Sequence, residues 1–339
     1  MKLLRITFAF AAAVLLAGGC VKTYVEQGGG DAIDFSAGSM LLRDDADYPT
    51  KSTAMNADFR VFGRRNASSV VFNGDAVTYS AGSWTYSPLR FWWWTYASDY
   101  YDFVGVAPLS NTGSAAIQGD ADITTVKAPY DATSDSYDLV IAATRILGTA
   151  ANPRAPVELE FYHMLSKVDV VVENTSDSPQ GLHLDGYHFR RLVTRGSAKA
   201  SFNDVNQSVL SWVDPVRANT NVGSVSSDID IASAGSYAGS SAMMIPQRLD
   251  VNPGGTGKPQ LVISYRYTPV GESVEEVKTE EIDLDTITRT AGGSDAIVQW
   301  EKGVHYTYTI RIRIGGDVRV NITTTEWDVD YAETPGLLI

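Results

Sequence analysis

The stretch YTYTIRIRI, residues 306–314, alternates apolar and polar side chains without interruption. Successive side chains of a β-strand point to opposite faces, so this pattern predicts a strand with one buried and one exposed face. The buried face would carry Tyr306, Tyr308, Ile310, Ile312 and Ile314. The threonines and arginines between them would face solvent.

Segments of the same kind recur along the chain. VELEFYHML (157–165) alternates in the same way, with apolar residues opposite two glutamates. Other short, β-branched segments are DLVIAA (138–143), VDVVVEN (168–174), LVISYRYTP (261–269) and VRVNITTTEW (318–327). The chain has 29 glycines and 13 prolines, turn residues bound many of these segments, and helical periodicity is hard to find. This organisation predicts an all-β protein with two tandem β-sandwich domains.

Composition also indicates where the chain divides. GTAANPRAP (148–156) is rich in glycine, alanine and proline, so we place a domain boundary there. The predicted N-terminal sandwich covers residues 31–152 and the C-terminal sandwich residues 153–339. Residues 20–30 contain a run of three glycines and are predicted to form a flexible tether.

Residues 1–19 are typical of a secretory signal peptide. A basic start precedes an apolar run over residues 6–17, and small residues lead to Cys20. The pattern resembles the lipobox of bacterial lipoproteins, although Leu16 stands one position further from the cysteine than in that motif. Cys20 is therefore the predicted lipidation site. The alternative is an ordinary cleaved signal with an incidental cysteine.

Lipidation of Cys20 would have two consequences. Because Cys20 is the only cysteine, the mature chain would have no free thiol, which excludes disulfides, zinc–thiolate sites and cysteine nucleophiles. Because no later segment is apolar enough or long enough to span a bilayer, the lipid alone would hold the chain at the cell outer membrane.

The chain is acidic. Its 339 residues carry a formal net charge of −13, and Lys2 and Arg5 are the only charges in residues 1–19, so the mature chain carries −15. A surface of this sign argues against binding to nucleic acid and against adsorption to anionic lipid.

Few residues of the chain suggest a metal site. HLDGYH (183–188) sets His183, Asp185 and His188 close together, and in a loop they would be able to meet a metal ion. Histidines with no ligand are the favoured interpretation. We therefore predict no metal and no cofactor.

Two segments bear a superficial likeness to catalytic motifs. PGGTGKP (253–259) lacks the first glycine and the serine or threonine of a phosphate-binding loop, and it predicts a hairpin turn instead. Glu158 and Glu160 share a strand face, which is more typical of a solvated edge than of a glycosidase pair. We predict that the protein is not an enzyme.

One segment is unusually aromatic. RFWWWTYASDYYDF (90–103) holds eight aromatic side chains in fourteen positions. A strand cannot send three consecutive tryptophans to one face, so at least one large ring must find cover outside the main core or stay exposed.

Seven segments follow one another in an informative order. They are DFRVFG (58–63), WTYSPLRFWWWTYASDYYDFVGVAP (84–108), YDLVIAATR (137–145), VELEFYHMLSKVDVVVEN (157–174), MMIPQ (243–247), WEKGVHYTYTIRIRI (300–314) and TTTEW (323–327). Each motif alone is weak. The ordered set, behind a lipoprotein signal, resembles the fimbrillin family, which comprises the type V pilus subunits of Bacteroidota and their relatives.

The resemblance implies two transthyretin-like, Greek-key sandwiches. It assigns the aromatic segment to the N-terminal sandwich, where Tyr101, Phe103 and Pro108 fill a Tyr-x-Phe-x-x-x-x-Pro pattern. Core packing is then the favoured role of the tryptophans. A glycan platform and a contact with another subunit stay open for Trp92, Trp93 and Trp94.

The resemblance also implies a route of assembly. An outer-membrane trypsin-like protease cuts after the first strand, that strand departs, and a strand of a neighbouring subunit replaces it by β-strand addition. The segment AIDFSAGSML (32–41) fits the removable strand, with Ile33, Phe35, Ala37 and Leu41 expected on one face.

Arg43 is the predicted processing site, because the acidic, proline-bearing segment after it is a plausible exposed loop. The alternative is that Arg43 is merely a loop arginine and the strand stays in place. Lys51 is a second candidate for the cut. Arg64-Arg65 is disfavoured, because a cut there would also remove the segment FRVFG.

The other end of the chain has an apolar terminus, formed by Leu337, Leu338 and Ile339. It is the predicted C-terminal donor strand, although it is short and carries Pro335; a fraying end is the alternative. We expect a structural or adhesive subunit of a surface fimbria, with other pilus subunits and a host or bacterial surface glycan or protein as partners. A lipid-retained anchor subunit and a surface glycan-binding lipoprotein are the alternatives.

Overall fold

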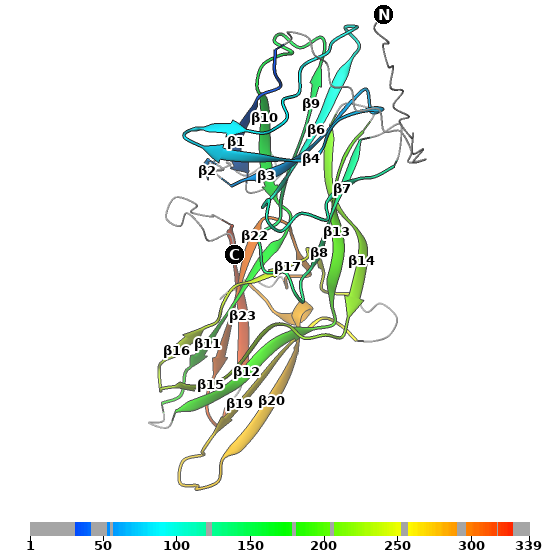
Figure 1. Cartoon of the computed structure of the whole chain (residues 1–339). Coiled ribbons are helices and arrows are strands. Elements are labelled where there is room, and N and C mark those ends of the chain that lie inside the picture. Colours follow the sequence, from blue (N-terminus) through cyan, green and yellow to red (C-terminus); the bar gives the residue numbers. More distant parts are fainter. Residues whose placement is uncertain are drawn as a thin grey trace, which may run out of the picture.

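The computed structural model describes residues 31–41, 53–54, 57–119, 124–177, 181–203, 207–251, 257–289, 296–316 and 318–327. Over these residues the protein is all-β, as the alternating segments predict (Figure 1). The described residues include one short 3₁₀-helix, η2 (Leu284–Thr286). None of the described segments forms a helix with the length and apolar character that a bilayer crossing requires.

The first sheet has eight strands. Their order across the sheet is β2-β1-β10-β9-β6-β3-β4-β5. The strands are β1 (Phe35–Leu41), β2 (Thr53–Ala54), β3 (Phe59–Arg65), β4 (Ser69–Ser80), β5 (Ser83–Thr85), β6 (Tyr100–Ala107), β9 (Val140–Leu147) and β10 (Val157–His163). All neighbouring pairs are antiparallel except β1 and β10, which are parallel.

A second sheet covers one face of the first. It consists of β7 (Ala116–Ile117), β8 (Thr125–Asp131), β13 (Leu192–Phe202) and β14 (Ser208–Ala218), in the order β14-β13-β8-β7. Phe103 and Val104, which are successive residues of β6, belong to two different cores. Because β6 is buried on both faces, its sequence is nearly continuous in apolar residues rather than alternating.

The remaining strands form two further sheets with a common core. One contains β11 (Ser166–Asn174), β16 (Ser236–Ala238), β17 (Ala242–Met244), β22 (Val304–Ile312) and β23 (Val318–Glu326). The other contains β12 (Leu182–Arg190), β15 (Val222–Ile231), β19 (Gln260–Tyr267) and β20 (Glu276–Asp283). The alternation predicted for residues 306–312 is confirmed, because Tyr306, Tyr308, Ile310 and Ile312 are all buried. The short strands β18 (Gln247–Arg248) and β21 (Gln299–Trp300) pair with each other.

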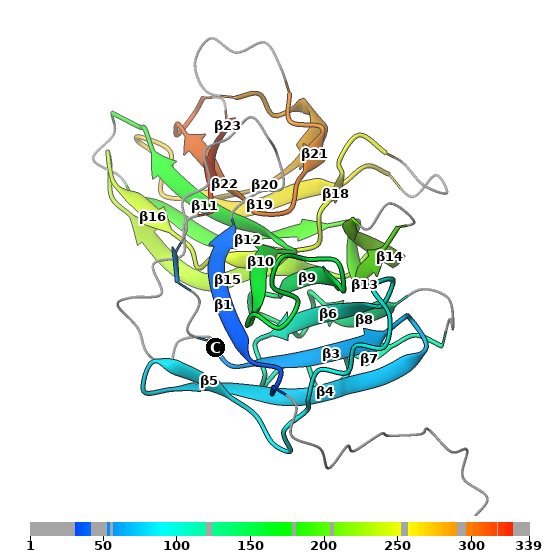
Figure 2. The ribbon, with the colours of Figure 1, turned by 90° about the horizontal axis from the view of Figure 1, so that it is seen from above.

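Strand pairing crosses the predicted boundary at residue 152. β10 pairs with β9, and β13 returns from the second half of the chain to pair with β8 (Figures 1 and 2). Between β10 and β11, Met164 and Leu165 are fully buried, and the indole of Trp212 donates a hydrogen bond to the carbonyl of Met164 (2.6 Å). The hydrogen-bonded sheets do not separate at residue 152. The division into domains of residues 31–152 and 153–339 therefore stays a prediction.

Candidate functional site

The start of the described chain is hydrogen-bonded on both of its edges. β1 pairs with β10 on one side and, over Ser39 and Met40, with β2 on the other. Just before β1, the amide of Ile33 donates to the carbonyl of Arg90 (2.9 Å), and Asp31 accepts from the amide of Trp92 (3.1 Å). The first strand is therefore an integral part of the sheet, as Figure 2 shows for β1 beside β10.

The side chains of Ile33 and Phe35 occupy a buried aromatic site. Ile33 is fully buried, and Phe35 is only 7% exposed to solvent. The Phe35 ring packs at 5.5–6.1 Å, edge to face, against four rings that we call the Phe35 cluster: Phe59, Phe72, Tyr86 and Phe103. The hydroxyl of Tyr86 also donates to the carbonyl of Ile33 (2.7 Å).

The energy of this burial is large for so short a segment. A fully buried apolar side chain of this size contributes about 1.5–3 kcal/mol, so Ile33 and Phe35 together contribute about 3–6 kcal/mol. Edge-to-face aromatic pairs add to that figure. A folded chain therefore keeps the first strand in place unless another segment fills the Phe35 cluster.

The register of β1 differs from uninterrupted alternation. Phe35 lies opposite Val157 and Ala37 opposite Leu159, but a bulge follows. As a result Met40, rather than Leu41, lies opposite Phe161, and Leu41 lies opposite Tyr162. The register therefore does not place Leu41 in the row of Phe35 and Ala37, where it was predicted, and Met40 takes that position instead. Gly38 inside the strand was the signal for such a bulge.

Several predicted site residues lie outside the described residues, namely Cys20, Arg43, Lys51, Leu337, Leu338 and Ile339. Arg43 and Lys51 belong to the connection between β1 and β2. The side chains of Ala37 and Leu41 are likewise outside the description. Their predicted roles stay predictions.

Arg64 and Arg65 are built into β3, between β4 and β6. The Arg64 guanidinium is buried and donates to the carbonyls of Ala67 (3.0 Å) and Gln118 (3.3 Å). Arg65 pairs with Asp99 at 2.7 Å. Neither arginine presents an extended, exposed peptide to a protease.

The aromatic segment divides its tryptophans between core and surface. Only Phe91 of residues 91–96 forms a bridge, with Ala32, so the segment is not a regular strand. Trp92 is buried and stacks on Trp94 with the ring centroids 5.5 Å apart. Trp93 stays 40% exposed. The expectation that one ring stays outside the core is therefore confirmed, and the ring is that of Trp93.

A carboxylate fixes the turn that follows these tryptophans. Asp99 accepts hydrogen bonds from Arg65, from Asn66 and from the amides of Thr95 (2.7 Å) and Tyr96 (3.0 Å). The hydrogen bond from Arg65, followed by those from the two amides and Asn66, holds the pKa of Asp99 well below its usual range. The guanidinium of Arg65 also lies 4.6 Å from the centroid of the Trp93 ring, which is a cation–π distance.

The predicted histidine group is only partly brought together. His183 and Asp185 of β12 approach Asp228 of β15, with ligand atoms within 4.8 Å of one another, and His188 is not part of that group. Hydrogen bonds that the imidazole donates to Asp228 and then to Asp230 raise the pKa of His183. The guanidinium of Arg266 lies 3.3 Å from Asp185 and also contacts Asp228. This positive charge among the carboxylates is typical of an ion-pair network and disfavours a bound cation.

Comparison with known families matches the fimbrillin-like family over residues 48–327. The structure of a fimbrial protein from Bacteroides vulgatus ATCC 8482 is similar, with a TM-score of 0.57 and 15% sequence identity over 88% of this chain and 100% of that chain. The tip fimbrial protein Mfa3 from Porphyromonas gingivalis, with a C-terminal truncation, is more distant, with a TM-score of 0.35 and 12% identity over 81% of this chain and 95% of that chain. No curated protein sequence matches.

The family match begins after β1 and Arg43, so it does not bear on the removable strand. It does cover the rest of the eight-stranded sheet and all of the other sheets, and it confirms the resemblance carried by the seven ordered motifs. The chain belongs to the fimbrillin-like family.

Proposed function

We propose that the protein is a structural subunit of a surface fimbria, exported as a lipoprotein through Cys20 and first held at the cell outer membrane. Family membership and the similar fold of a fimbrial protein support this function. The subunit acts by binding other pilus subunits and not by catalysis.

Assembly proceeds by exchange of the first strand. An outer-membrane trypsin-like protease cuts after Arg43, and residues 20–43 are then no longer joined to the rest of the subunit. An incoming strand that pairs with β10 and fills the Phe35 cluster replaces β1. The donor is the C-terminal segment of a neighbouring subunit, which ends in Leu337, Leu338 and Ile339.

The observation that carries this proposal is the parallel pairing of β1 with β10, with Ile33 and Phe35 buried in the Phe35 cluster. The first strand is the only part of its sandwich that a single cut would disconnect without breaking the chain between the other described strands. An emptied position would expose a strand edge and an aromatic surface, which favours pairing with a second chain.

Limited proteolysis tests the proposal. Trypsin acting on the folded mature chain should give a product that begins at Asp44, and size-exclusion chromatography should then show oligomers. The double variant Arg43→Ala, Lys51→Ala should stay monomeric under the same treatment, whereas the matched variant Lys51→Ala should behave as wild type. A product beginning at Asp44 that remains monomeric would contradict strand exchange.

A competition experiment separates filling of the Phe35 cluster from nonspecific association. A synthetic peptide of residues 31–41 should slow oligomer formation by the cut protein. The same peptide with Ile33→Asp and Phe35→Asp should have no effect. Deleting residues 328–339 should leave the subunit folded but unable to form chains; chain formation by that truncated subunit would exclude the C-terminal donor.

A second candidate function uses the exposed aromatic surface. Trp93 is 40% exposed and Tyr96 is 70% exposed, which suits contact with a glycan or with another subunit. This role is compatible with a lipid-retained anchor subunit or a surface glycan-binding lipoprotein. Trp93→Ala should weaken adhesion of intact cells without changing export, and unchanged adhesion would remove this candidate.

A further inference from the structure

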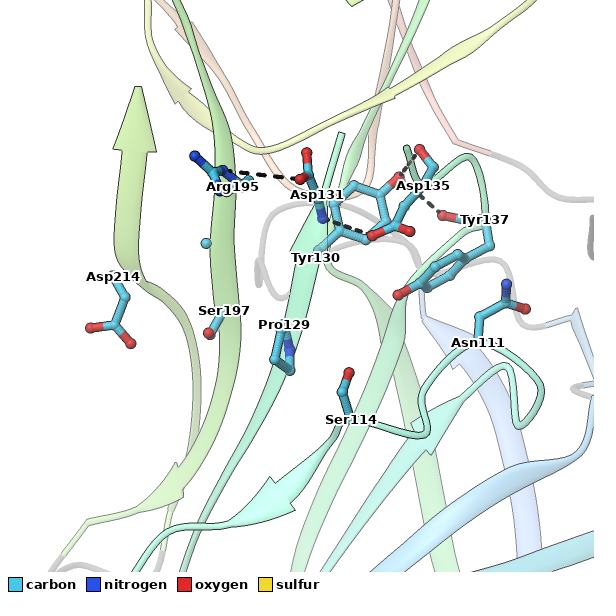
Figure 3. A pocket seen from close by; sticks show the side chains of 11 residues that line it. Asn111, Ser114, Pro129, Tyr130, Asp131, Asp135, Tyr137, Arg195, Ser197 and Asp214 are labelled. Atoms are coloured by element: carbon cyan, nitrogen blue, oxygen red, sulfur yellow. Dashed lines mark hydrogen bonds and ion pairs between the residues drawn. The ribbon is translucent and has the colours of Figure 1, made fainter. Parts of the chain in front are cut away.

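A depression opens on the sheet that contains β8 and β13 (Figure 3), and neither the Phe35 cluster nor Trp93 contributes to its lining. Its volume is about 360 Å³. The loop after β6, the end of β8 and the middle of the β13–β14 pair contribute its walls. The side chains that matter most are Ser114, Asp135, Tyr137, Arg195, Ser197 and Asp214.

The depression forms where the β13–β14 ladder is irregular. The register shifts on both sides of Arg195, so the two strands bend there. Opposite this bend Asp214 has a φ of 55°, which a non-glycine residue seldom adopts. On the other side of β13, Pro129 lies opposite Ser197 and offers no amide to the ladder. The local sequence therefore holds the sheet open at this position.

Tyr137 directs an unpaired hydroxyl into the depression. The residue retains only 5% exposure, and its ring packs edge to face on Tyr130 with the centroids 5.2 Å apart. Figure 3 shows the hydroxyl pointing between Pro129 and Ser114, and it forms no hydrogen bond with any described residue. Burial, and then the charge of Asp135, raise the pKa of Tyr137 to about 12, so the phenol stays neutral. The hydroxyl is not among the buried polar atoms of the described residues that lack a partner, so it is open to solvent in the depression and can donate to and accept from a ligand there.

Other hydrogen-bonding groups line the same depression. One carboxylate oxygen of Asp135 accepts the amide of Asp131 (2.7 Å), and no described residue hydrogen-bonds to the other. Ser114 and Ser197 add hydroxyls, which both donate and accept, and Arg195 adds a donor.

The charges around the depression do not cancel. Asp131, Asp135 and Asp214 supply three negative charges, against Arg195 and Lys127, which pairs with Asp214 at 2.8 Å. An acidic ligand would therefore be repelled. A basic side chain would hydrogen-bond only to the acceptors that line the depression, and it would leave the donors there without a partner.

We propose that this depression binds a neutral sugar residue, with the Tyr137 hydroxyl and the Asp135 carboxylate as its principal hydrogen-bonding groups. A sugar ring carries adjacent hydroxyls that donate and accept at once, which matches the mixed lining. The volume lies at the lower end of the range for small-molecule sites, as a single ring or a disaccharide requires.

Titration by two-dimensional NMR tests the proposal on the full mature chain carrying Cys20→Ser, which keeps it free of lipid. The probes are the methyl glycosides of glucose, galactose, mannose and N-acetylglucosamine, at concentrations up to ~50 mM, well above a millimolar dissociation constant. At least one should shift amide signals of residues 130–137 and 195–197. Immobilised oligosaccharides that end in the same sugar distinguish a surface glycan, which should bind more tightly, from a free monosaccharide.

The variant Tyr137→Phe removes only the hydroxyl that points into the depression. Because that hydroxyl has no protein partner, the variant should unfold at the same urea concentration as wild type. It should nevertheless bind the sugar about fivefold more weakly, the loss expected for one hydrogen bond. Asp135→Asn should weaken binding as well.

Tyr79→Phe is the matched control, because it removes an exposed tyrosine hydroxyl on β4 that does not line this depression, and it should bind as wild type. Three results would overturn the proposal: no shift with any of the four glycosides, equal affinity in wild type and Tyr137→Phe, or displacement of the sugar signal to residues 92–96. Binding of tetralysine without binding of any glycoside would assign the depression to a basic peptide instead.

Discussion

Two parallel strand pairs, one in each half of the chain, differ in how firmly they are held. In the first half, β1 pairs with β10 at five positions and the register shifts between Ala37 and Met40. In the second half, β11 pairs with β22 at eight consecutive positions without a shift, and β22 pairs with β23 at nine more. β22 is hydrogen-bonded to a strand on each side, and other strands precede and follow it in the chain.

The comparison shows that burial alone does not make a strand exchangeable. Phe35 and Tyr308 are both buried among aromatic rings. β1, however, is the first described strand, so one cut frees it, whereas removing β22 would need two cuts and would break the ladder on both sides. Position in the chain, together with an interrupted register, sets β1 apart.

The largest effect is expected from emptying the Phe35 cluster. Phe35→Ala should lower the free energy of unfolding by about 3–5 kcal/mol, because the cavity is closed in by rigid rings. Ile310→Ala in β22 should lower it by about 2–5 kcal/mol. Urea unfolding of the intact chain measures both.

The two substitutions should diverge once the chain is cut after Arg43. Phe35→Ala should then release residues 20–43 at once, whereas Ile310→Ala should release them no faster than wild type does. Val277→Ala, at a position that is 68% exposed on β20, is the control and should change stability by less than about 0.5 kcal/mol. Retention of the fragment by Phe35→Ala would show that the Phe35 side chain does not determine whether β1 stays bound.

A pair of tyrosine variants gives a smaller and more specific contrast. In the β22 region, the indole of Trp300 donates to the hydroxyl of Tyr308 (2.9 Å), and both side chains are fully buried. Tyr308→Phe should therefore cost about 1–3 kcal/mol, because it leaves the indole N–H unpaired. Tyr86→Phe removes the hydrogen bond to Ile33 and should cost about 0.5–1.5 kcal/mol.

Hydrogen exchange distinguishes the two tyrosine variants. Tyr86→Phe should speed exchange in β1 and leave β22 unchanged, since local opening follows local contacts. Tyr308→Phe should affect the second half instead. Equal acceleration of β1 by both variants would mean that the two regions open together.

Much of the fold followed from alternation along single segments. In residues 157–161 and 306–312, every second side chain is buried, as the alternation of apolar and polar residues predicts. The return of β13 to β8 did not follow, because strand pairing between distant segments leaves no periodic signal. The register of Leu41 was missed for a related reason: Gly38 permits a bulge but does not show where the ladder resumes.

The candidate sites were predictable to different degrees. Ile33 and Phe35 were identifiable, since an apolar alternating segment needs a partner surface. The four rings that receive Phe35 come from β3, β4, β6 and the segment after β5, and no local pattern joins them. No sequence pattern distinguishes Tyr137 from a core tyrosine, and only the position of its hydroxyl in the depression identifies it as a candidate binding residue.

The smallest expected effect concerns pH and the segment that holds the start of β1. The folded-state pKa of Asp99 is depressed below its unfolded value of 3.8, so its stabilising contribution is complete above that pH and is lost as the pH falls below it. Asp99→Asn should unfold at a lower temperature than wild type at pH 7, and the difference should shrink progressively as the pH falls below 3.8. Because the Asp99 turn positions Trp92, which donates to Asp31, hydrogen exchange at Ile33 should follow the same trend, whereas exchange at Tyr308 should not. A constant difference across this pH range would show that the carboxylate charge plays no part in holding the first strand.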